Sequence, residues 1–200
     1  MRIKILKNKS RVDEVVTVHM QSFPGFFLTF LGNGFLKELY KGFVEHNKSD
    51  LIVAVNDSNK IVGFLAYSKD LSGFYRYLIK RHILSLGWYA GCAFFKNPKI
   101  AFRLFGAFTY SEKAKKKEQY IELSSIGVLP DVKGQGIGSK MVYALKRIFH
   151  YEQCEYIKLE TDAKNNESAN FFYQKNGFIL HHRYQTREGR SMNEYRYYGD

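Results

Sequence analysis

A strand that turns through three closely spaced glycines into a long amphipathic helix is the feature that most constrains this chain of 200 residues. The segment reads Val-Leu-Pro-Asp-Val-Lys-Gly-Gln-Gly-Ile-Gly-Ser and runs from Val128 to Ser139. Glycines let a backbone approach a ligand closely, and the first amides of a helix lack internal partners where its dipole attracts anions. We therefore expect a pyrophosphate cradle at residues 133–139. A glycine turn without a ligand is the alternative.

The glycine spacing excludes two other phosphate-binding motifs. Gly134, Gly136 and Gly138 follow Gly-x-Gly-x-Gly, whereas the dinucleotide fingerprint is Gly-x-Gly-x-x-Gly. In a nucleotide P-loop the lysine follows the last glycine, but Lys133 precedes all three. The expected cradle therefore belongs to neither of these two motifs.

Hydrophobic periodicity places the cradle in an α/β fold with a mixed sheet and helices on both faces, in one domain over residues 1–200. Helical spacing of apolar residues predicts helices over 10–20, 35–46, 136–151 and 166–176. Alternating or continuous apolar runs predict strands over 2–7, 51–55, 61–67, 119–128, 156–161, 178–185 and 192–198.

Residues 71–118 depart from this pattern and predict a helical insertion. Ten Lys and Arg against two acids give the segment a net charge of +8, out of +12 for the whole chain. Aromatic and apolar residues alternate with these cations, as in a helix at a membrane surface or in a groove for an acidic, partly apolar partner. An amphipathic lid with a solvated basic face is the plain alternative. We expect two helical pieces, split near Gly87–Gly91 and again at Asn97–Pro98.

A second motif follows the cradle and reads Asn166-x-x-Ala169-x-x-Phe172-Tyr173-x-Lys175-x-Gly177-Phe178. With both motifs in order and spacing, the stretch 119–178 resembles the GNAT superfamily of N-acetyltransferases, which transfer acetyl from acetyl-CoA to an amine. One departure is that the family usually has Arg or Gln where Lys133 stands. The resemblance implies a GNAT-like acyl-CoA N-acyltransferase fold, with acetyl-CoA as co-substrate.

The same resemblance implies which residues bind the coenzyme. Backbone amides of the cradle hold the pyrophosphate, and Lys133 adds a point charge. Val128 offers backbone hydrogen bonds to the pantetheine arm, and an N–H near it polarises the thioester carbonyl. Asn166 bonds the coenzyme from the next helix, or only caps that helix. The full expected set is Val128, Lys133, Gly134, Gln135, Gly136, Ile137, Gly138, Ser139 and Asn166.

Acetyl transfer to an amine needs a base, because an alkylammonium with a pKa of about 10.4 is mostly protonated at neutral pH. Glu122 is the candidate, since several family members carry a glutamate base on this strand. A core or solvent-facing glutamate is the alternative, because the register of a bulged strand cannot be assigned to one residue. Ser124 or Ser125 with a water is the fallback. Tyr173 matches the general acid of the family, with packing beside Phe172 as the alternative.

No metal site is expected. The two cysteines, Cys92 and Cys154, are too few for a zinc site, and no cysteine or histidine pair has the spacing of metal ligands. His181 and His182 lie near the expected acceptor site, but consecutive strand residues point to opposite faces. At most one of them would face the site, and we assign neither a role.

The expected partner is a small-molecule primary amine that attacks acetyl-CoA directly in a ternary complex. The basic insertion favours an anionic amino sugar, linked to a nucleotide or a lipid. A protein or peptide amine is the next choice, and nucleic acid is disfavoured because no RNA-binding module is present. A different class stays open, in which the chain binds CoA or a membrane surface without catalysis.

The sequence also predicts where the chain resides. Its longest run without charged residues or histidine, Ile83 to Phe95, has 13 residues, whereas a membrane-spanning helix needs about 20. Residues 1–20 lack the apolar core of a secretory signal. We therefore expect a cytoplasmic protein with peripheral membrane contact through 71–118 as one option, and a homodimer as one arrangement.

Overall fold

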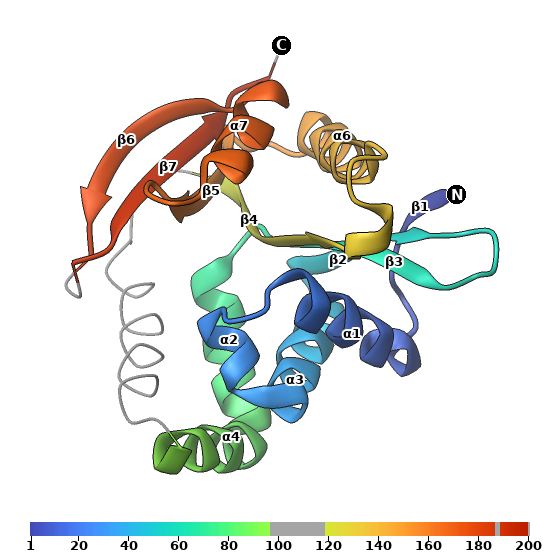
Figure 1. Ribbon diagram of the computed structural model, residues 1–200, viewed down its shortest axis with the longest axis vertical. Coiled ribbons are helices and arrows are strands. Elements are labelled where there is room, and N and C mark those ends of the chain that lie inside the picture. The colour runs from blue at the N-terminus through green and yellow to red at the C-terminus, as the bar shows by residue number, and fades with distance from the viewer. Residues whose placement is uncertain (97–118, 187–188, 200) are drawn as a thin grey trace.

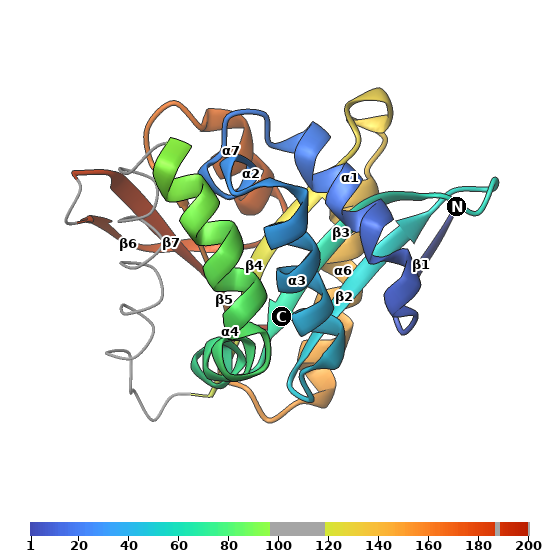
Figure 2. The same ribbon diagram turned by 90° about the horizontal axis from the view of Figure 1, so that it is seen from below.

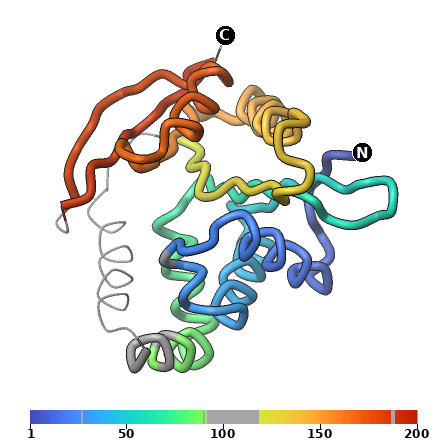
Figure 3. Tube along the Cα trace, in the orientation of Figure 1, coloured from blue at the N-terminus to red at the C-terminus, as the bar shows by residue number. Residues whose placement is uncertain are grey.

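The structure is a computed structural model that describes residues 1–96, 119–186 and 189–199, with the remaining residues drawn in grey in Figure 3. Its strands are β1 (Arg2–Ile5), β2 (Ser49–Val55), β3 (Ile61–Ser68), β4 (Tyr120–Val128), β5 (Tyr156–Asp162), β6 (Ile179–Gln185) and β7 (Ser191–Tyr197). Its helices are α1 (Val12–Ser22), α2 (Phe27–Phe30), α3 (Gly32–Glu45), α4 (Leu71–Lys96), α6 (Ile137–Tyr151) and α7 (Glu167–Lys175). Two 3₁₀ turns, η1 (Lys9–Arg11) and η2 (Pro130–Val132), complete the described elements.

The strands form one mixed sheet in the order β1-β2-β3-β4-β5-β7-β6. Strands β1 to β4 are antiparallel neighbours, β4 and β5 are parallel, and β7 pairs antiparallel with both β5 and β6. A parallel pair needs a crossover connection, which α6 supplies between β4 and β5. The mixed α/β sheet expected from the sequence is confirmed.

Helices cover both faces of the sheet. Helices α1, α3 and α4 lie on one face and α6 and α7 on the other (Figures 1 and 2). The first face buries residues such as Val15, Leu36 and Phe64 against the sheet. The second is covered by α6, whose predicted apolar stripe is buried at Ile137, Met141, Leu145 and Phe149 and partly buried at Ile148.

Two helical predictions were wrong in detail. One turn of helix, α2, follows the Pro24–Gly25 break, where no helix was expected. Helix α4 continues through Gly87–Gly91, and its non-helical backbone lies instead at His82 (φ −122°, ψ 17°). The His82 ring is tied to α3, with Nδ1 2.6 Å from Glu38 Oε2 and Nε2 3.5 Å from Glu45 Oε2. The kink therefore coincides with a tertiary contact between His82 and α3, which the positions of glycines in the sequence do not reveal.

The rest of the predicted insertion, including the expected break at Asn97–Pro98, lies outside the described residues. Among the helices that the structure describes, none combines the length and apolarity required to cross a membrane.

The pairing of β4 opens a gap in the sheet. The register of β3 with β4 shifts between Ala66 and Tyr67, which leaves Ser124 as an extra residue in a β-bulge. Strand β4 pairs with β5 only over Tyr120–Glu122, and β5 then continues along β7. The carboxyl half of β4 therefore separates from β5 where the chain enters the glycine segment.

Candidate functional site

The cradle starts where β4 passes through η2 and enters α6. Gly134 and Gly136 have φ values of +84° and +73°, in the left-handed region where glycine is strongly preferred. A Cβ built on either residue meets no atom within 4 Å. Glycine is therefore required here by backbone conformation, and the loop borders open space.

The first turn of α6 offers backbone N–H groups as hydrogen-bond donors. The amides of Ile137, Gly138 and Ser139 occupy the first turn, and a hydrogen bond of helical type starts with Lys140 N to Gly136 O, at 3.0 Å. Such first-turn amides and the helix dipole favour an anion. The Ile137 side chain is buried, so this residue offers only its backbone to a ligand.

Gly138 also has a packing role that the sequence did not reveal. A Cβ on Gly138 would lie 3.1 Å from the ring of Phe172 on α7. The absence of a side chain therefore lets α7 approach the start of α6. Lys133, Gln135 and Ser139 share the same loop and first turn, with Lys133 and Gln135 exposed.

Val128 lies at the end of β4, where the strand has left β5. Its carbonyl accepts a hydrogen bond from Ser22 Oγ of α1, at 2.9 Å. A carbonyl has two lone pairs, so one acceptor position remains beside this contact.

Asn166 stands at the N-cap of α7, as its place in the motif predicts, but its side chain does not cap the helix. Its Nδ2 donates instead to Thr161 Oγ1 of β5, at 2.7 Å. Asn170 donates to the carbonyls of Asn166 and Asp162, at 2.7 and 2.9 Å. These bonds fix the start of α7 to the end of β5, and the plain-cap alternative is wrong.

Tyr173 lies on α7 and packs among aromatic rings. Its centroid is 5.4 Å from Phe172, 6.0 Å from Phe178 and 6.0 Å from Tyr195. Burial raises the pKa of Tyr173 to about 12. The phenol therefore keeps its proton at neutral pH, as a proton donor must before it acts.

Glu122 faces away from α6 and α7. Its strand neighbours Ile121 and Leu123 pack with α6, and strand alternation turns Glu122 to the face of α1, α3 and α4. Only 8% of the Glu122 residue is exposed to solvent, so the carboxyl group is buried. The charge of Glu122 contributes to raising the pKa of Tyr75 on α4, after the larger effect of burial.

Lys158 of β5 is shared by carboxylates from three strands. Its Nζ is 2.9 Å from Glu160 Oε1, 3.8 Å from Glu194 Oε2 and 3.9 Å from Glu122 Oε2. Arg196 Nε binds Glu194 Oε1 at 2.7 Å. We call Glu122, Lys158, Glu160, Glu194 and Arg196 the ion cluster. Sequence reasoning found only Glu122, because sheet pairing brings the other members together.

The ion cluster shifts the protonation of its members. Burial raises the pKa of Glu122 to about 8, with Glu160 and Glu194 adding to this effect and Lys158 opposing it. Burial lowers the pKa of Lys158, but the attraction of Glu122, Glu160 and Glu194 outweighs it and the net shift is upward. Lys158 therefore stays charged, whereas Glu122 can exchange a proton near neutral pH.

The two fallback serines differ in their surroundings. Ser124 is the exposed bulge residue, whereas Ser125 is partly buried and hydrogen-bonds the Tyr40 side chain. The Tyr40 hydroxyl also lies 2.7 Å from His19 Nδ1. The sequence did not predict this series of hydrogen bonds from His19 through Tyr40 to Ser125, because His19 and Tyr40 lie at expected core positions of two helices.

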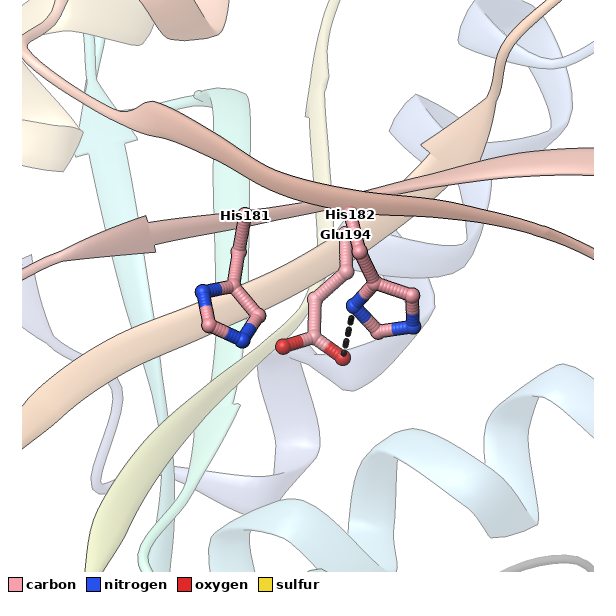
Figure 4. A group of neighbouring side chains, drawn as sticks. All are labelled: His181, His182 and Glu194. Carbon is pink, nitrogen blue, oxygen red and sulfur yellow. Dashed lines mark ion pairs between the residues drawn. The ribbon is translucent and has the colours of Figure 1, made fainter.

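His181 and His182 do not point to opposite faces, and that prediction was wrong. The register of β6 with β7 shifts between Leu180 and His182, so His181 is the extra residue of a bulge. The two ring centroids are 5.5 Å apart. Both rings lie beside Glu194 of β7 (Figure 4).

The family model of the Acetyltransferase (GNAT) family matches residues 18–178. No curated protein sequence matches the chain. A solved protein assigned to the GNAT acetyltransferases, from Desulfovibrio desulfuricans, superposes with a TM-score of 0.66 at 14% identity over 98% of each chain.

Two further solved structures share the fold. Aminoglycoside 6'-acetyltransferase type Ii has a TM-score of 0.64 at 14% identity, over 99% of this chain and 97% of that one. A Bacillus anthracis protein assigned as a streptothricin acetyltransferase, solved with acetyl coenzyme A, has a TM-score of 0.52 at 16% identity, over 80% of this chain and 68% of that one. Because the family model spans most of the sequence and the described fold agrees with it, the chain belongs to the GNAT family of acetyltransferases and is an acyltransferase.

Proposed function

We propose that this acyltransferase is an N-acetyltransferase, in one domain, that moves acetyl from acetyl-CoA to a primary amine by direct attack in a ternary complex. One observation carries the proposal: strand β4 leads into a helix start whose first-turn amides favour an anion, and the same strand bears a buried glutamate whose pKa is raised to about 8. The Bacillus anthracis structure with acetyl coenzyme A supports this co-substrate. We expect the enzyme in the cytoplasm.

The cradle fits the diphosphate of CoA. Two glycines in left-handed conformation border open space, and the first-turn amides of α6 supply donors to phosphate oxygens. Exposed Lys133 adds positive charge beside them. Val128, where β4 separates from β5, is the proposed contact for the pantetheine arm, and Asn166 at the start of α7 is a further proposed contact with CoA.

The residues around the gap have complementary roles. The thioester supplies the acetyl group when acetyl-CoA is bound. Glu122 accepts a proton from the ammonium group of the acceptor, which leaves a neutral amine to attack the thioester, and a pKa of about 8 lets it do so near neutral pH. Tyr173 gives its proton to the departing thiolate. That transfer is uphill by about 5 kcal/mol if the thiol pKa is about 8.5, so the site must assist it.

The acceptor class rests on charge. Exposed Arg76, Lys80 and Arg81 on α4 favour the anionic amino sugar expected from the sequence. Glu122, a proton acceptor near neutral pH, favours an ammonium group at the point of reaction. An amino sugar carrying a remote anionic group satisfies both. A cationic amino sugar, the kind of substrate that an aminoglycoside acetyltransferase modifies, and a peptide amine are the alternatives.

A screen of amine acceptors with a free-thiol readout tests the proposal. Amino-sugar nucleotides, cationic aminoglycosides, polyamines and peptides are compared with acetyl-CoA at saturation. We expect transfer to at least one amine, with large losses in Glu122→Gln and Tyr173→Phe. Glu155→Gln and Tyr143→Phe change exposed residues and serve as matched controls. Binding of acetyl-CoA without transfer to any amine would favour the non-catalytic module instead.

A peripheral membrane contact is a second candidate function, favoured by one exposed face of α4. Leu84 and Trp88 are 87% and 71% exposed, and Ile83 is 58% exposed, beside the exposed cations Lys80 and Arg81. Apolar and basic residues together suit an anionic lipid surface.

Sedimentation with phosphatidylglycerol vesicles tests this contact. We expect the chain to sediment with these vesicles, and the double variant Leu84→Glu, Trp88→Glu to remain in solution. The control is Tyr143→Glu, Tyr151→Glu, which changes two exposed aromatic residues of α6. Equal sedimentation of both double variants would contradict the assignment to α4.

A further inference from the structure

The bulge in β6 gathers three metal-ligand side chains outside the proposed acetyl-CoA site. His182 pairs with Glu194 across the strands, and His181 is the inserted residue beside them. Residues opposite each other in an antiparallel pair share a face, and the bulge turns the neighbouring histidine to that same side. Figure 4 shows both imidazoles flanking the Glu194 carboxylate.

The distances are close to those of a coordination sphere. One ligand atom from each of the three residues lies within 4.8 Å of the others, and His182 Nδ1 is 3.8 Å from Glu194 Oε2. Zinc bonds of about 2.0 to 2.2 Å in tetrahedral geometry place ligand atoms roughly 3.3 Å apart. The set must therefore close by about an ångström. Both histidines are exposed, with 49% of the His182 side chain accessible, so rotation of their rings can supply that movement.

Neighbouring groups orient two of the ligands. Arg196 Nε binds Glu194 Oε1 at 2.7 Å, which leaves Oε2 turned toward His182. The Tyr198 hydroxyl lies 3.5 Å from His181 Nδ1, which leaves Nε2 of that ring for an ion. Outer partners of this kind fix the orientation of metal ligands.

Among the described residues, two cations contact Glu194 and oppose a metal ion at this place: Arg196, bound to Oε1, and Lys158. Lys158 Nζ is 3.8 Å from Glu194 Oε2, but it is closer to Glu160 Oε1, at 2.9 Å. Glu122 lies 3.9 Å from the same ammonium. Lys158 therefore keeps its nearest carboxylate, Glu160, when Glu194 binds a metal.

We propose that His181, His182 and Glu194 form a binding site for a divalent transition-metal ion of the Zn²⁺ class. Two imidazoles and one carboxylate form a donor set that binds such ions in preference to Mg²⁺ or Ca²⁺. Three protein ligands leave a further position for water or another donor. This site lies on the β6–β7 hairpin, separate from the cradle, and shares Glu194 with the ion cluster. A metal ion is no part of the proposed acetyl transfer, so the site goes beyond it.

Titration of the full-length chain with Co²⁺ and Zn²⁺ tests the site, after removal of any histidine tag and treatment with a chelator. We expect one equivalent of Co²⁺ to give visible absorption bands that Zn²⁺ abolishes. Loss of a direct ligand should weaken binding at least as much as loss of an outer partner, which typically costs roughly 10–100-fold. His181→Ala and His182→Ala should both show this loss.

The matched control is His150→Ala, which removes an exposed histidine of α6 and should leave the titration unchanged. Glu194→Gln tests the third ligand, and its thermal unfolding in chelator shows whether the fold survives loss of the Arg196 ion pair. The proposal is overturned if the wild type binds neither ion, if His181→Ala and His182→Ala bind as the wild type does, or if His150→Ala is equally impaired.

Discussion

Glu122 changes charge within the pH range in which amine acetylation is measured, because its burial raises its pKa to about 8. A general base acts only when deprotonated, so the rate should rise with pH and level off above pH 8. Glu122→Gln should lower the rate by roughly 10²- to 10⁴-fold and abolish this rise. The pH profile of kcat/KM at fixed acetyl-CoA measures both effects.

A second variant separates this role from a structural one. Lys158 lowers the pKa of Glu122, so Lys158→Gln should move the midpoint of the profile to higher pH. A profile with no midpoint between pH 6 and 9 in the wild type would remove Glu122 from the mechanism.

His19 makes the stability of the fold depend on pH. Burial lowers its pKa to about 4, and only 1% of the residue is exposed. The unfolded chain has a histidine pKa of about 6.5, so it binds the proton first as pH falls. The free energy of unfolding should decrease between pH 6.5 and 4, by about 3 kcal/mol from this group. Urea unfolding of the wild type and of His19→Gln at pH 7 and pH 5 measures this decrease. An equal change in the free energy of unfolding between the two pH values in both proteins would contradict the prediction.

Sequence reasoning reached some of these residues and not others. Glu122 could be found because it precedes the cradle on one continuous strand. Its partners Lys158 and Glu194 could not, because they belong to strands whose neighbours are set by sheet order. Tyr40 and His19 read as core residues, and only tertiary packing reveals their hydrogen bond.

Long, strongly periodic elements were predictable, and local irregularities were not. The apolar stripe of α6 and the strand before the cradle were both confirmed. The kink at His82 and the bulge at His181 were missed, since each depends on partners in another element. Consecutive histidines face opposite sides only in a regular strand, and the bulge removes that condition.

The junction of α6 with α7 depends on Gly138. Replacing a helical glycine by alanine usually stabilises a helix by about 0.5 to 1 kcal/mol. Gly87→Ala on α4 should show this gain, because a Cβ there meets nothing within 4 Å. Gly138→Ala should not, because its Cβ would lie 3.1 Å from Phe172. Thermal unfolding compares the two variants, and an equal gain in both would contradict the packing role.

At the scale of the whole molecule, the proposed coenzyme-binding residues and the proposed base lie on opposite faces of the sheet. The cradle begins a helix on one face, and Glu122 is buried on the other. The gap between β4 and β5 connects the two faces, because β4 and β5 are paired only as far as Glu122, whereas the pairing of β5 with β7 continues. The order of elements along the chain predicted a mixed sheet, but it did not predict that β7 would lie between β5 and β6. That placement brings Glu194 and Arg196 to Lys158.

Calorimetric titration with acetyl-CoA tests the central claim most directly. Gly136→Glu places charge, bulk and a strained left-handed residue at the start of α6, whereas Tyr143→Glu adds the same charge to an exposed position of that helix. We expect saturable binding in the wild type and in Tyr143→Glu, and no measurable heat in a Gly136→Glu variant whose circular dichroism matches the wild type. Wild-type affinity in Gly136→Glu, or no binding by the wild type, would contradict coenzyme binding at the cradle.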